Sequence, residues 1–373
     1  MDISLYFHIP FCQKKCPYCH FFSFTPNESH IKNYMQALFL EYKQKENFLK
    51  NANIISIYFG GGTPTFLNEK HIATILNWIS QSSFIPSYCE ITIETNPNIN
   101  LKKIYGLKKT GINRISMGAQ SLDDNDLKIL KRDHTKKDVI NTLDNLSKHF
   151  ENISIDIMYD IPYQTKANFS NTLQEIEKLP INHVSLYNLT FETNTLFYRK
   201  KEKLLPFVPN SCLSLEMLDM AIDKFKKMGL ERYEISAFAK DNKISIHNSG
   251  YWTGRAFLGL GPSAFSYFNK KRFQNSLNFN QYVQNLKNHL SPVCFEEQLK
   301  YPDNINELLA VNLRLTKGID LKRFQKKWKK LPESTLQKLC KLEKENFVIK
   351  KNNTIFLSEK GLLFYDNVAE TII

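Results

Sequence analysis

Three cysteines near the start of the chain are spaced so that they could bind an iron-sulfur cluster. Cys12, Cys16 and Cys19 follow the pattern C-x3-C-x2-C in a segment that comes directly after an apolar, strand-like run. Thiolates are soft ligands, and three of them at these short intervals can each bind one iron of a single 4Fe-4S cluster. The fourth iron would then be open to an amine and a carboxylate of a small molecule.

S-adenosylmethionine (SAM) offers both groups at its methionine end. An electron passed from such a cluster to the SAM sulfonium would break a carbon-sulfur bond and release a 5'-deoxyadenosyl radical. A zinc site is the alternative for the same cysteines, with His8 or His20 as the fourth ligand, although zinc ligands more often come as two C-x2-C pairs. The motifs further along the chain favour the cluster.

The composition is that of a folded protein from a reducing compartment. The chain has 373 residues, 42% of them hydrophobic, which is enough for one barrel-sized domain and a small one. No segment approaches the roughly 18 consecutive apolar residues of a membrane span, so we expect a cytoplasmic protein that meets membranes only peripherally. Seven cysteines, an odd number, also fit a reducing compartment. The four outside the motif are expected to pack as small hydrophobic side chains, namely Cys89, Cys212, Cys294 and Cys340.

The net charge of +13 has two explanations. It would attract an acidic electron donor of the flavodoxin or ferredoxin type, which a reductively started reaction needs. Lysines spread over solvated helices account for the same charge without any partner.

Apolar runs alternate with amphipathic stretches through the first half of the chain. We expect strands in six of these runs, at Ile3 to His8, Ile54 to Phe59, Glu90 to Thr95, Asn113 to Met117, Ile153 to Met158 and His183 to Asn188. Helical patterns between nearly every pair predict β/α units and a parallel sheet. Six units are two fewer than a closed barrel has, so the predicted fold is α/β, an open, partial (β/α)6 barrel whose opening admits a large, flat substrate.

The cysteine segment LYFHIPFCQKKCPYCHFF resembles the radical SAM superfamily, in particular the branch around oxygen-independent coproporphyrinogen III dehydrogenase (HemN) and the heme chaperone HemW. The resemblance implies SAM bound by motifs at the strand ends. Three glycines before Thr63 would meet the methionine amine, although an ordinary glycine turn has the same sequence. Arg132 would hold the carboxylate in a bidentate fork. The residues implied for SAM are Tyr6, Tyr18, Gly61, Gly62, Thr63, Glu94, Gln120, Arg132 and Asp156.

Two of these implications carry alternatives. Tyr6 and Tyr18 match positions near the cluster or SAM, but simple core packing explains both tyrosines equally well. Relatives usually read Tyr-Gly-Leu-Pro-Gly-Gln-Thr after the fifth strand, whereas Asp160 and Tyr163 replace the two glycines here. The backbone conformation at these two positions therefore has to be established.

The hexapeptide His247-Asn-Ser-Gly-Tyr251-Trp252 fits the HNxxYW pattern of the heme chaperone branch. An imidazole can bind heme iron axially, and two large aromatic side chains can cover a porphyrin face. His247, Tyr251 and Trp252 are therefore candidate heme residues. The alternative is that they seal a domain junction, as buried aromatic residues commonly do.

From about Pro292 the chain changes character. Helical patterns at 306–315, 321–328 and 335–345 precede a hairpin pattern at 347–357. We therefore expect a barrel domain over residues 1–290 and an α+β, winged-helix-like domain over residues 291–373. Winged helices often bind nucleic acid, but the related family carries a similar domain without that activity, so no nucleic acid is expected.

The resemblance leaves two functions. A heme chaperone would bind a 4Fe-4S cluster, SAM and heme, and would hand heme to hemoproteins, including membrane-associated ones. An oxygen-independent coproporphyrinogen III dehydrogenase would instead oxidatively decarboxylate two propionates to vinyl groups. The enzyme branch typically has a further cysteine where Phe21 stands, and an N-terminal extension where Cys12 here follows the start closely. Together with the HNSGYW segment, these features predict the heme chaperone. The sequence does not determine which residues are catalytic, whether SAM is consumed, which hemoprotein receives the heme, or the oligomeric state.

Overall fold

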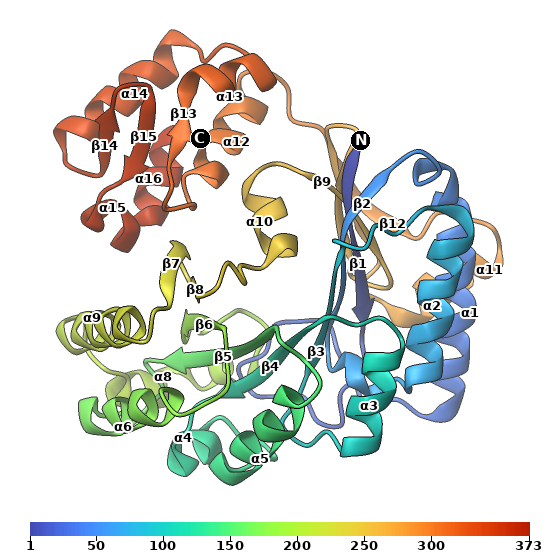
Figure 1. Ribbon diagram of the computed structural model, residues 1–373. Coiled ribbons are helices and arrows are strands. Elements are labelled where there is room, and N and C mark those ends of the chain that lie inside the picture. Colours follow the sequence, from blue (N-terminus) through green and yellow to red (C-terminus); the bar gives the residue numbers. More distant parts are fainter.

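The computed structural model describes residues 1–373 and shows a strongly curved sheet with a second, smaller sheet at the C-terminal end (Figure 1). The large sheet has the order β12-β11-β10-β9-β1-β2-β3-β4-β5-β6-β8-β7. Besides β9 (Ala256–Leu260), which pairs in parallel with β1, its parallel strands are β1 (Asp2–Ile9), β2 (Asn53–Gly61), β3 (Glu90–Thr95), β4 (Arg114–Gln120), β5 (Ile153–Tyr159) and β6 (His183–Asn188). Strands β1 to β6 are the six predicted strands, so the α/β partial barrel is confirmed.

The two faces of this sheet differ in chemistry. In β1, Leu5 and Phe7 are fully buried in the main core, while the alternate residues Ser4, Tyr6 and His8 turn to the other face. The remaining parallel strands repeat the pattern with isoleucine, valine, leucine and methionine on the core side and polar residues opposite. The inner face of the partial barrel is therefore a polar surface supported by an apolar core.

Helices cover the outer, apolar face of the sheet (Figure 1). They are α1 (Glu28–Lys45), α2 (Glu69–Ser82), α3 (Leu101–Lys109), α4 (Asp124–Ile129), α5 (Lys136–Ser147), α6 (Lys166–Ile176) and α9 (Ser211–Lys227). Each begins after an Asn, Asp or Thr whose side chain accepts a hydrogen bond from a free backbone N–H of the first turn. Short 3-10 turns are η1 (Glu46–Phe48), η2 (Pro64–Phe66) and η3 (Leu205–Phe207).

Both edges of the sheet carry strands that the sequence did not predict. One edge gains β7 (Glu231–Glu234) and β8 (Ala237–Ala239), and the other gains β9 (Ala256–Leu260), β10 (Phe265–Phe268), β11 (Lys271–Asn275) and β12 (Val293–Glu297). The same region contains α7 (Leu196–Arg199), α8 (Lys201–Leu204), α10 (Ile246–Trp252) and α11 (Phe279–Lys287). Short strands with mixed polar and aromatic residues lack the long apolar runs that identified β1 to β6.

The C-terminal part has its own core and sheet. Its elements are α12 (Asp303–Asn312), β13 (Ile319–Asp320), α13 (Leu321–Lys327), α14 (Glu333–Lys344), β14 (Val348–Lys351), β15 (Thr354–Leu357), α15 (Glu359–Leu363) and α16 (Tyr365–Ile372). The separate core includes Leu309, Leu313, Phe324 and Val368. Because β12 pairs with β11, we propose that the division between the domains lies after β12, a few residues beyond the predicted one at 290/291.

The expected packing of the four remaining cysteines was wrong for three of them. Cys89 is buried, but Cys212, Cys294 and Cys340 are exposed. Cys294 lies on the edge strand β12, and the other two lie on outward sides of α9 and α14, where no neighbouring layer covers them. No helix of the structure is long and apolar enough to cross a membrane.

Candidate functional site

The cysteine loop lies between β1 and α1, and its two ends are hydrogen bonded to each other. Cys12 N donates to Phe24 O at 3.0 Å, and Phe24 N donates to Pro10 O at 2.9 Å. Within the loop, Cys19 N donates to Cys16 O at 3.2 Å. These bonds hold the three half-buried cysteines at the carboxyl end of β1.

A cavity of about 170 Å³, here called the strand-end cavity, opens against this loop. It is lined by every residue predicted for the cluster and SAM except Tyr6. The predicted residues in it are Cys12, Cys16, Tyr18, Cys19, Gly61, Gly62, Thr63, Glu94, Gln120, Arg132 and Asp156. Asn96 and Ser116 also line it and were not predicted, although Asn96 follows Glu94 by two residues and Ser116 lies on the polar face of β4.

The glycine segment passes so close to the cysteine loop that side chains do not fit. A Cβ on Gly62 would lie 2.6 Å from the backbone oxygen of Phe11 and 3.0 Å from Cys12 Sγ. Gly61 has a φ of +109° and would place a Cβ 2.7 Å from the His8 ring. The glycines are thus part of the support of the cysteine loop rather than an isolated turn.

Tyr6 lies behind the strand-end cavity, in the floor of the barrel. Its hydroxyl is 3.1 Å from His8 Nδ1, and its ring stacks on Tyr58 with centroids 6.1 Å apart. His8 Nε2 is 2.8 Å from Phe22 O, so both ring nitrogens of His8 are engaged, and burial lowers its pKa to about 4. Packing therefore explains Tyr6, and Tyr18 alone of the pair lines the cavity.

No three His, Cys, Asp or Glu side chains form a group that could hold a single metal ion. This includes the three cysteines, each of which would bind a different iron of a cluster. Of the two histidines considered for a zinc site, His8 is buried as described. His20 is exposed and packs against the ring of Phe21, with centroids 4.5 Å apart.

Two buried carboxyl groups line the strand-end cavity. Glu94 accepts hydrogen bonds from the Tyr58 hydroxyl (2.8 Å) and from Gly61 N (3.2 Å). Burial raises the pKa of Glu94 to about 7, and it raises the pKa of Asp156 to about 6 against the opposing hydrogen bonds of Ser185 and Ser116. Such carboxyl groups can accept hydrogen bonds from ligand hydroxyls and gain charge when a cation binds beside them.

Arg132 connects the cysteine loop to the third and fourth strands. Its terminal nitrogens lie 3.2 Å from Cys16 Sγ, 2.7 Å from Asn96 Oδ1 and 2.8 Å from Gly118 O. Its Nε is buried without a partner and remains a donor for an acceptor that enters the site.

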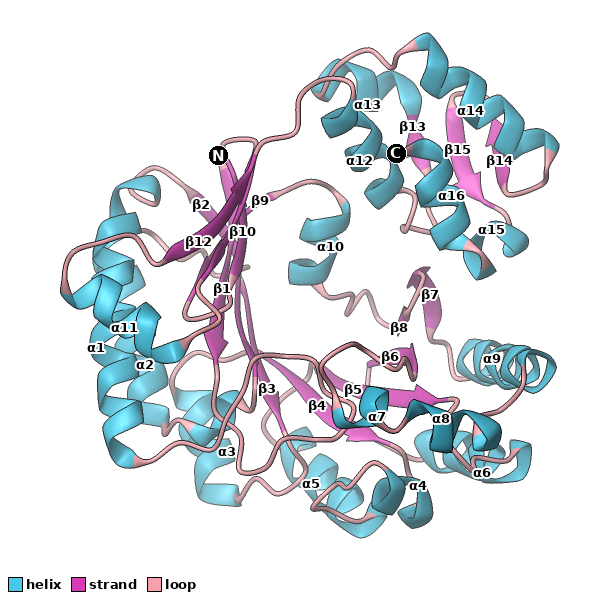
Figure 2. Cartoon of the chain, turned by 180° about the vertical axis from the view of Figure 1, so that it is seen from behind, coloured by secondary structure: helices cyan, strands magenta, loops and turns pink.

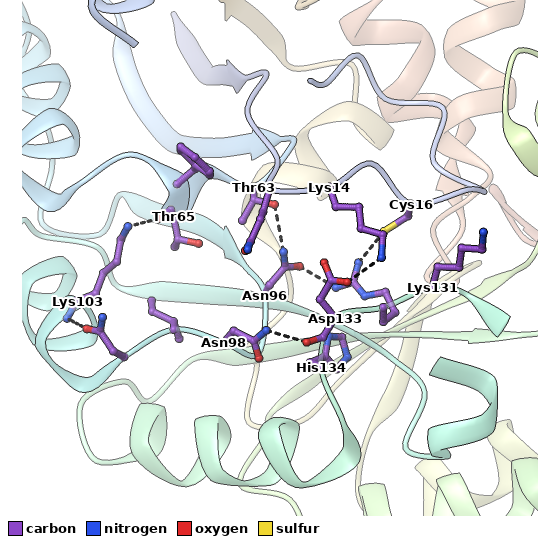
Figure 3. Close-up of a pocket in the computed structure, with 15 residues that line it drawn as sticks. Lys14, Cys16, Thr63, Thr65, Asn96, Asn98, Lys103, Lys131, Asp133 and His134 are labelled. Atoms are coloured by element: carbon purple, nitrogen blue, oxygen red, sulfur yellow. Dashed lines mark hydrogen bonds and ion pairs between the residues drawn. The ribbon is translucent and has the colours of Figure 1, made fainter. Parts of the chain in front are cut away.

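Cys16 and Arg132 also border a second hollow, the outer cavity of about 250 Å³ (Figure 3). Lys14 lines it and pairs with Asp133 at 2.9 Å. Lys103 and Lys131 line it as well, so the outer side of Cys16 is basic.

A third hollow, the barrel cavity of about 320 Å³, continues from the strand-end cavity along the inner face of the sheet. It shares Glu94, Gln120 and Asp156 with that cavity and extends to Tyr187 and Glu192. Its charged lining is mostly acidic, since it contains Glu94, Asp156 and Glu192 but only one arginine, Arg114, and no lysine.

The HNSGYW segment forms α10, which lies on the inner side of the sheet (Figure 1). His247 is buried, with Nδ1 2.9 Å from Ser56 Oγ and Nε2 2.8 Å from the Tyr251 hydroxyl. Tyr251 and Trp252 line the junction cavity, a fourth hollow of about 360 Å³ between β9, β10, β11 and α12. The structure thus places two of the three predicted heme residues on one cavity and His247 behind them.

The two residues that replace glycines after β5 keep a glycine-like backbone. Asp160 has a φ of 62° and Tyr163 a φ of 67°. Asp160 accepts hydrogen bonds from Ser214 Oγ at 2.6 Å and from the Asn188 side chain, which hold the loop in this conformation. The substitution has therefore changed the side chains without changing the path of the chain.

Comparison with known proteins identifies the family. The heme chaperone HemW of Buchnera aphidicola subsp. Acyrthosiphon pisum is 31% identical over 100% of this chain and 98% of its own. The chain belongs to the radical SAM superfamily. Residues 6–176 of this radical SAM protein match the Radical SAM superfamily model, and residues 299–364 match the HemN C-terminal domain. HemW of Bacillus subtilis is 29% identical, with 98% of this chain and 97% of that protein covered.

The fold of this radical SAM protein is that of a solved relative. Coproporphyrinogen III oxidase (HemN) from Escherichia coli superposes with a TM-score of 0.88 at 24% identity, covering 100% of this chain and 90% of that one. Membership of the superfamily implies a 4Fe-4S cluster and SAM. The strand-end cavity fits both groups, since three thiols lie on one wall and the free Nε of Arg132 lies beside the two carboxyl groups.

Proposed function

We propose that this radical SAM protein is a heme carrier that binds heme and delivers it to hemoproteins, including membrane-associated ones. The cluster bound by Cys12, Cys16 and Cys19 would supply an electron to SAM. Full-length relatives with about 30% identity that are named heme chaperones support this function. Phe21 supports it too, because it lines the strand-end cavity at the position where the enzyme branch has a cysteine.

The observation that carries the proposal is the chemistry of the junction cavity. Tyr251, Trp252, Phe257 and Phe265 give it an aromatic lining. Heme is a flat apolar ring with two carboxylates, and aromatic faces are its natural packing partners. The indole Nε1 of Trp252 is buried without a partner and so is a free donor for a ligand.

Charge also favours the junction cavity over the barrel cavity for a dicarboxylate ligand. Arg255 and Arg272 line the junction cavity together with one acid, Glu307. Arg272 is paired with Glu307 and Glu297, whereas Arg255 makes no ion pair in the structure and is the cation left for a ligand carboxylate. In the barrel cavity, Glu94, Asp156 and Glu192 would face the ligand instead. Carboxylates of heme would be attracted by the first lining and repelled by the second.

His247 has a supporting role in this arrangement. Ser56 Oγ donates its single proton to Ser4 Oγ, so His247 Nδ1 donates to Ser56 and Nε2 accepts from the Tyr251 hydroxyl. Burial lowers the pKa of His247 to about 3, which keeps the imidazole neutral. We propose that His247 orients Tyr251, whose ring faces the cavity, and that it does not bind the iron.

Hemin titration of the purified protein tests this function. We expect a saturable Soret band at one heme per chain and transfer of that heme to an apo-hemoprotein such as apomyoglobin. The variant Phe84→Ala removes an aromatic side chain that is 80% exposed elsewhere and should bind and transfer heme as the native protein does. Absence of a saturable band, or bound heme that never transfers, would contradict the proposal.

A further inference from the structure

An exposed apolar and basic surface lies beside the barrel opening and takes no part in the sites described above. It consists of the exposed side chains in residues 196–207, together with Tyr163, and is here called the lip. Its apolar members are Tyr163, Leu196, Tyr198, Leu205 and Phe207. Its cationic members are Arg199, Lys200, Lys201 and Lys203.

The lip has a buried side that already satisfies the fold. Phe197 packs in a small separate core with Leu130, Met158, Ile161 and Leu189. Its backbone N–H donates to Pro17 O at 2.9 Å, which ties α7 to the cysteine loop. The segment is thus anchored to the fold through its buried side.

The outward apolar side chains of the lip are each about half exposed. Leu196, Leu205 and Tyr163 are 50%, 52% and 53% exposed, and Phe207 is 47% exposed. Single exposed apolar residues are normal on a protein surface, but a contiguous group marks a surface that binds something.

Tyr163 extends this group from a strained position. Its φ of 67° is one that glycine adopts freely and tyrosine rarely does. Its ring stacks on Phe207 with centroids 4.3 Å apart, and its N–H donates to Phe207 O at 2.7 Å. The chain therefore keeps a large aromatic ring at the lip where a glycine would be easier to accommodate.

A block of cations lies between these apolar residues in the sequence. Arg199, Lys200 and Lys203 are exposed, Lys201 lies over the Tyr198 ring at 4.8 Å, and Glu202 is the only acid among residues 196–207. Aromatic and leucine side chains beside lysine and arginine suit the boundary between lipid headgroups and acyl chains, where rings insert and cations meet anionic phosphates.

We propose that the lip docks this protein on an anionic lipid bilayer. Leu189, Thr190 and Glu192 line the barrel cavity directly before the lip begins, so docking would turn the barrel opening toward the membrane. Figure 2 shows α7 and α8 in front of β5 and β6, at that opening. The inference deepens the proposed function, because a carrier held at a membrane would meet membrane hemoproteins there.

Sedimentation with lipid vesicles tests the proposal. The full-length protein is mixed with vesicles of phosphatidylcholine containing roughly 30% phosphatidylglycerol, or of phosphatidylcholine alone, at low and high salt. We expect binding to the anionic vesicles that is at least about tenfold stronger than to the neutral ones and that weakens at high salt.

Two double variants separate the apolar from the electrostatic contribution to vesicle binding. Tyr163→Gly with Phe207→Ser, and Lys200→Glu with Lys203→Glu, should each lower the partition coefficient at least about tenfold. Matched controls are Phe84→Ser and Lys350→Glu with Lys351→Glu, which change exposed residues far from the lip and should bind vesicles normally. The glycine variant suits its own backbone conformation, so thermal melting should show a folded protein.

Native protein that stays unbound with anionic vesicles, or lip variants that bind as well as the native protein, would overturn the proposal. Binding only to vesicles that contain a membrane protein would also overturn it, in favour of a protein partner. Heme titration of the same variants keeps the two proposals apart. A normal Soret band with lost vesicle binding would leave the proposal of heme carriage intact. A missing Soret band with normal vesicle binding would contradict heme carriage but leave the proposal that the lip docks on membranes.

Discussion

The strand-end cavity and the junction cavity are built in different ways. Each parallel strand from β1 to β5 contributes residues at or near its carboxyl end to the strand-end cavity, and that edge of the sheet brings them together. The junction cavity joins α10 and the short strands β9, β10 and β11 to α12 of the other domain. The first is polar and formed by one sheet; the second is apolar and depends on packing between domains. Cofactor binding and cargo binding should therefore be separable by substitution.

Replacing Cys16 by alanine should have the largest effect, and on the strand-end cavity alone. We expect the iron-sulfur absorbance of anaerobically reconstituted protein to disappear, because three thiolates are the fewest that can hold the cluster with one open iron. Hemin binding should remain. Cys294→Ala, which removes an exposed thiol, is the control and should reconstitute normally. One equivalent of zinc without iron in the native protein would show that the cysteines have another role.

The pH dependence of SAM binding tests the role of Glu94 in the strand-end cavity. Burial raises the pKa of Glu94 to about 7, and the sulfonium cation of SAM favours the ionised carboxylate. Affinity should thus rise about tenfold between pH 6 and pH 8, since the ionised fraction of Glu94 rises by that factor. Equilibrium binding to the reconstituted protein measures this. Glu94→Gln should bind SAM more weakly than the native protein at pH 8, and its affinity should rise only about twofold over that range, because Asp156 with its pKa of about 6 still titrates there. An unchanged tenfold rise would assign the titration to another group.

Trp252→Ala tests the junction cavity. Loss of one aromatic face and its free N–H should weaken hemin binding about tenfold, on the order of 1.4 kcal/mol, with SAM binding unchanged. Hemin titration and SAM binding on one preparation provide the comparison. Trp252→Phe, which keeps a ring, should recover most of the affinity. Equal losses at both cavities would mean that the two are coupled.

His247→Ala should have the smallest effect on ligand binding. The Soret maximum should stay where it is, because both ring nitrogens already have protein partners. The free energy of unfolding should fall by about 1–3 kcal/mol, since the buried Ser56 and Tyr251 hydroxyls each lose a partner. Absorption spectra and thermal melting follow the two quantities. A shifted Soret maximum would instead identify His247 as an iron ligand.

The sequence predicted the strand-end cavity well because its residues follow long apolar strands whose ends must converge. Glu94 and Asp156 could be assigned to one edge of the sheet from the strand pattern and the family motifs alone. The junction cavity could not be foreseen, because Phe257 and Phe265 come from short strands outside the six predicted ones and Leu308 comes from another domain. Likewise, no local pattern showed that Tyr6 packs in the barrel floor, or that His247 is enclosed by Ser56 and Tyr251.

The central claim is that this radical SAM protein carries heme and does not decarboxylate coproporphyrinogen III. An anaerobic assay of cluster-reconstituted protein with SAM, a strong reductant and coproporphyrinogen III tests it most directly, following porphyrin products and 5'-deoxyadenosine. A decarboxylating HemN preparation serves as the positive control. We expect that a preparation that binds hemin forms no porphyrin with vinyl groups. This holds whether or not 5'-deoxyadenosine is produced. Formation of protoporphyrinogen IX would contradict it and make the protein an oxidative decarboxylase.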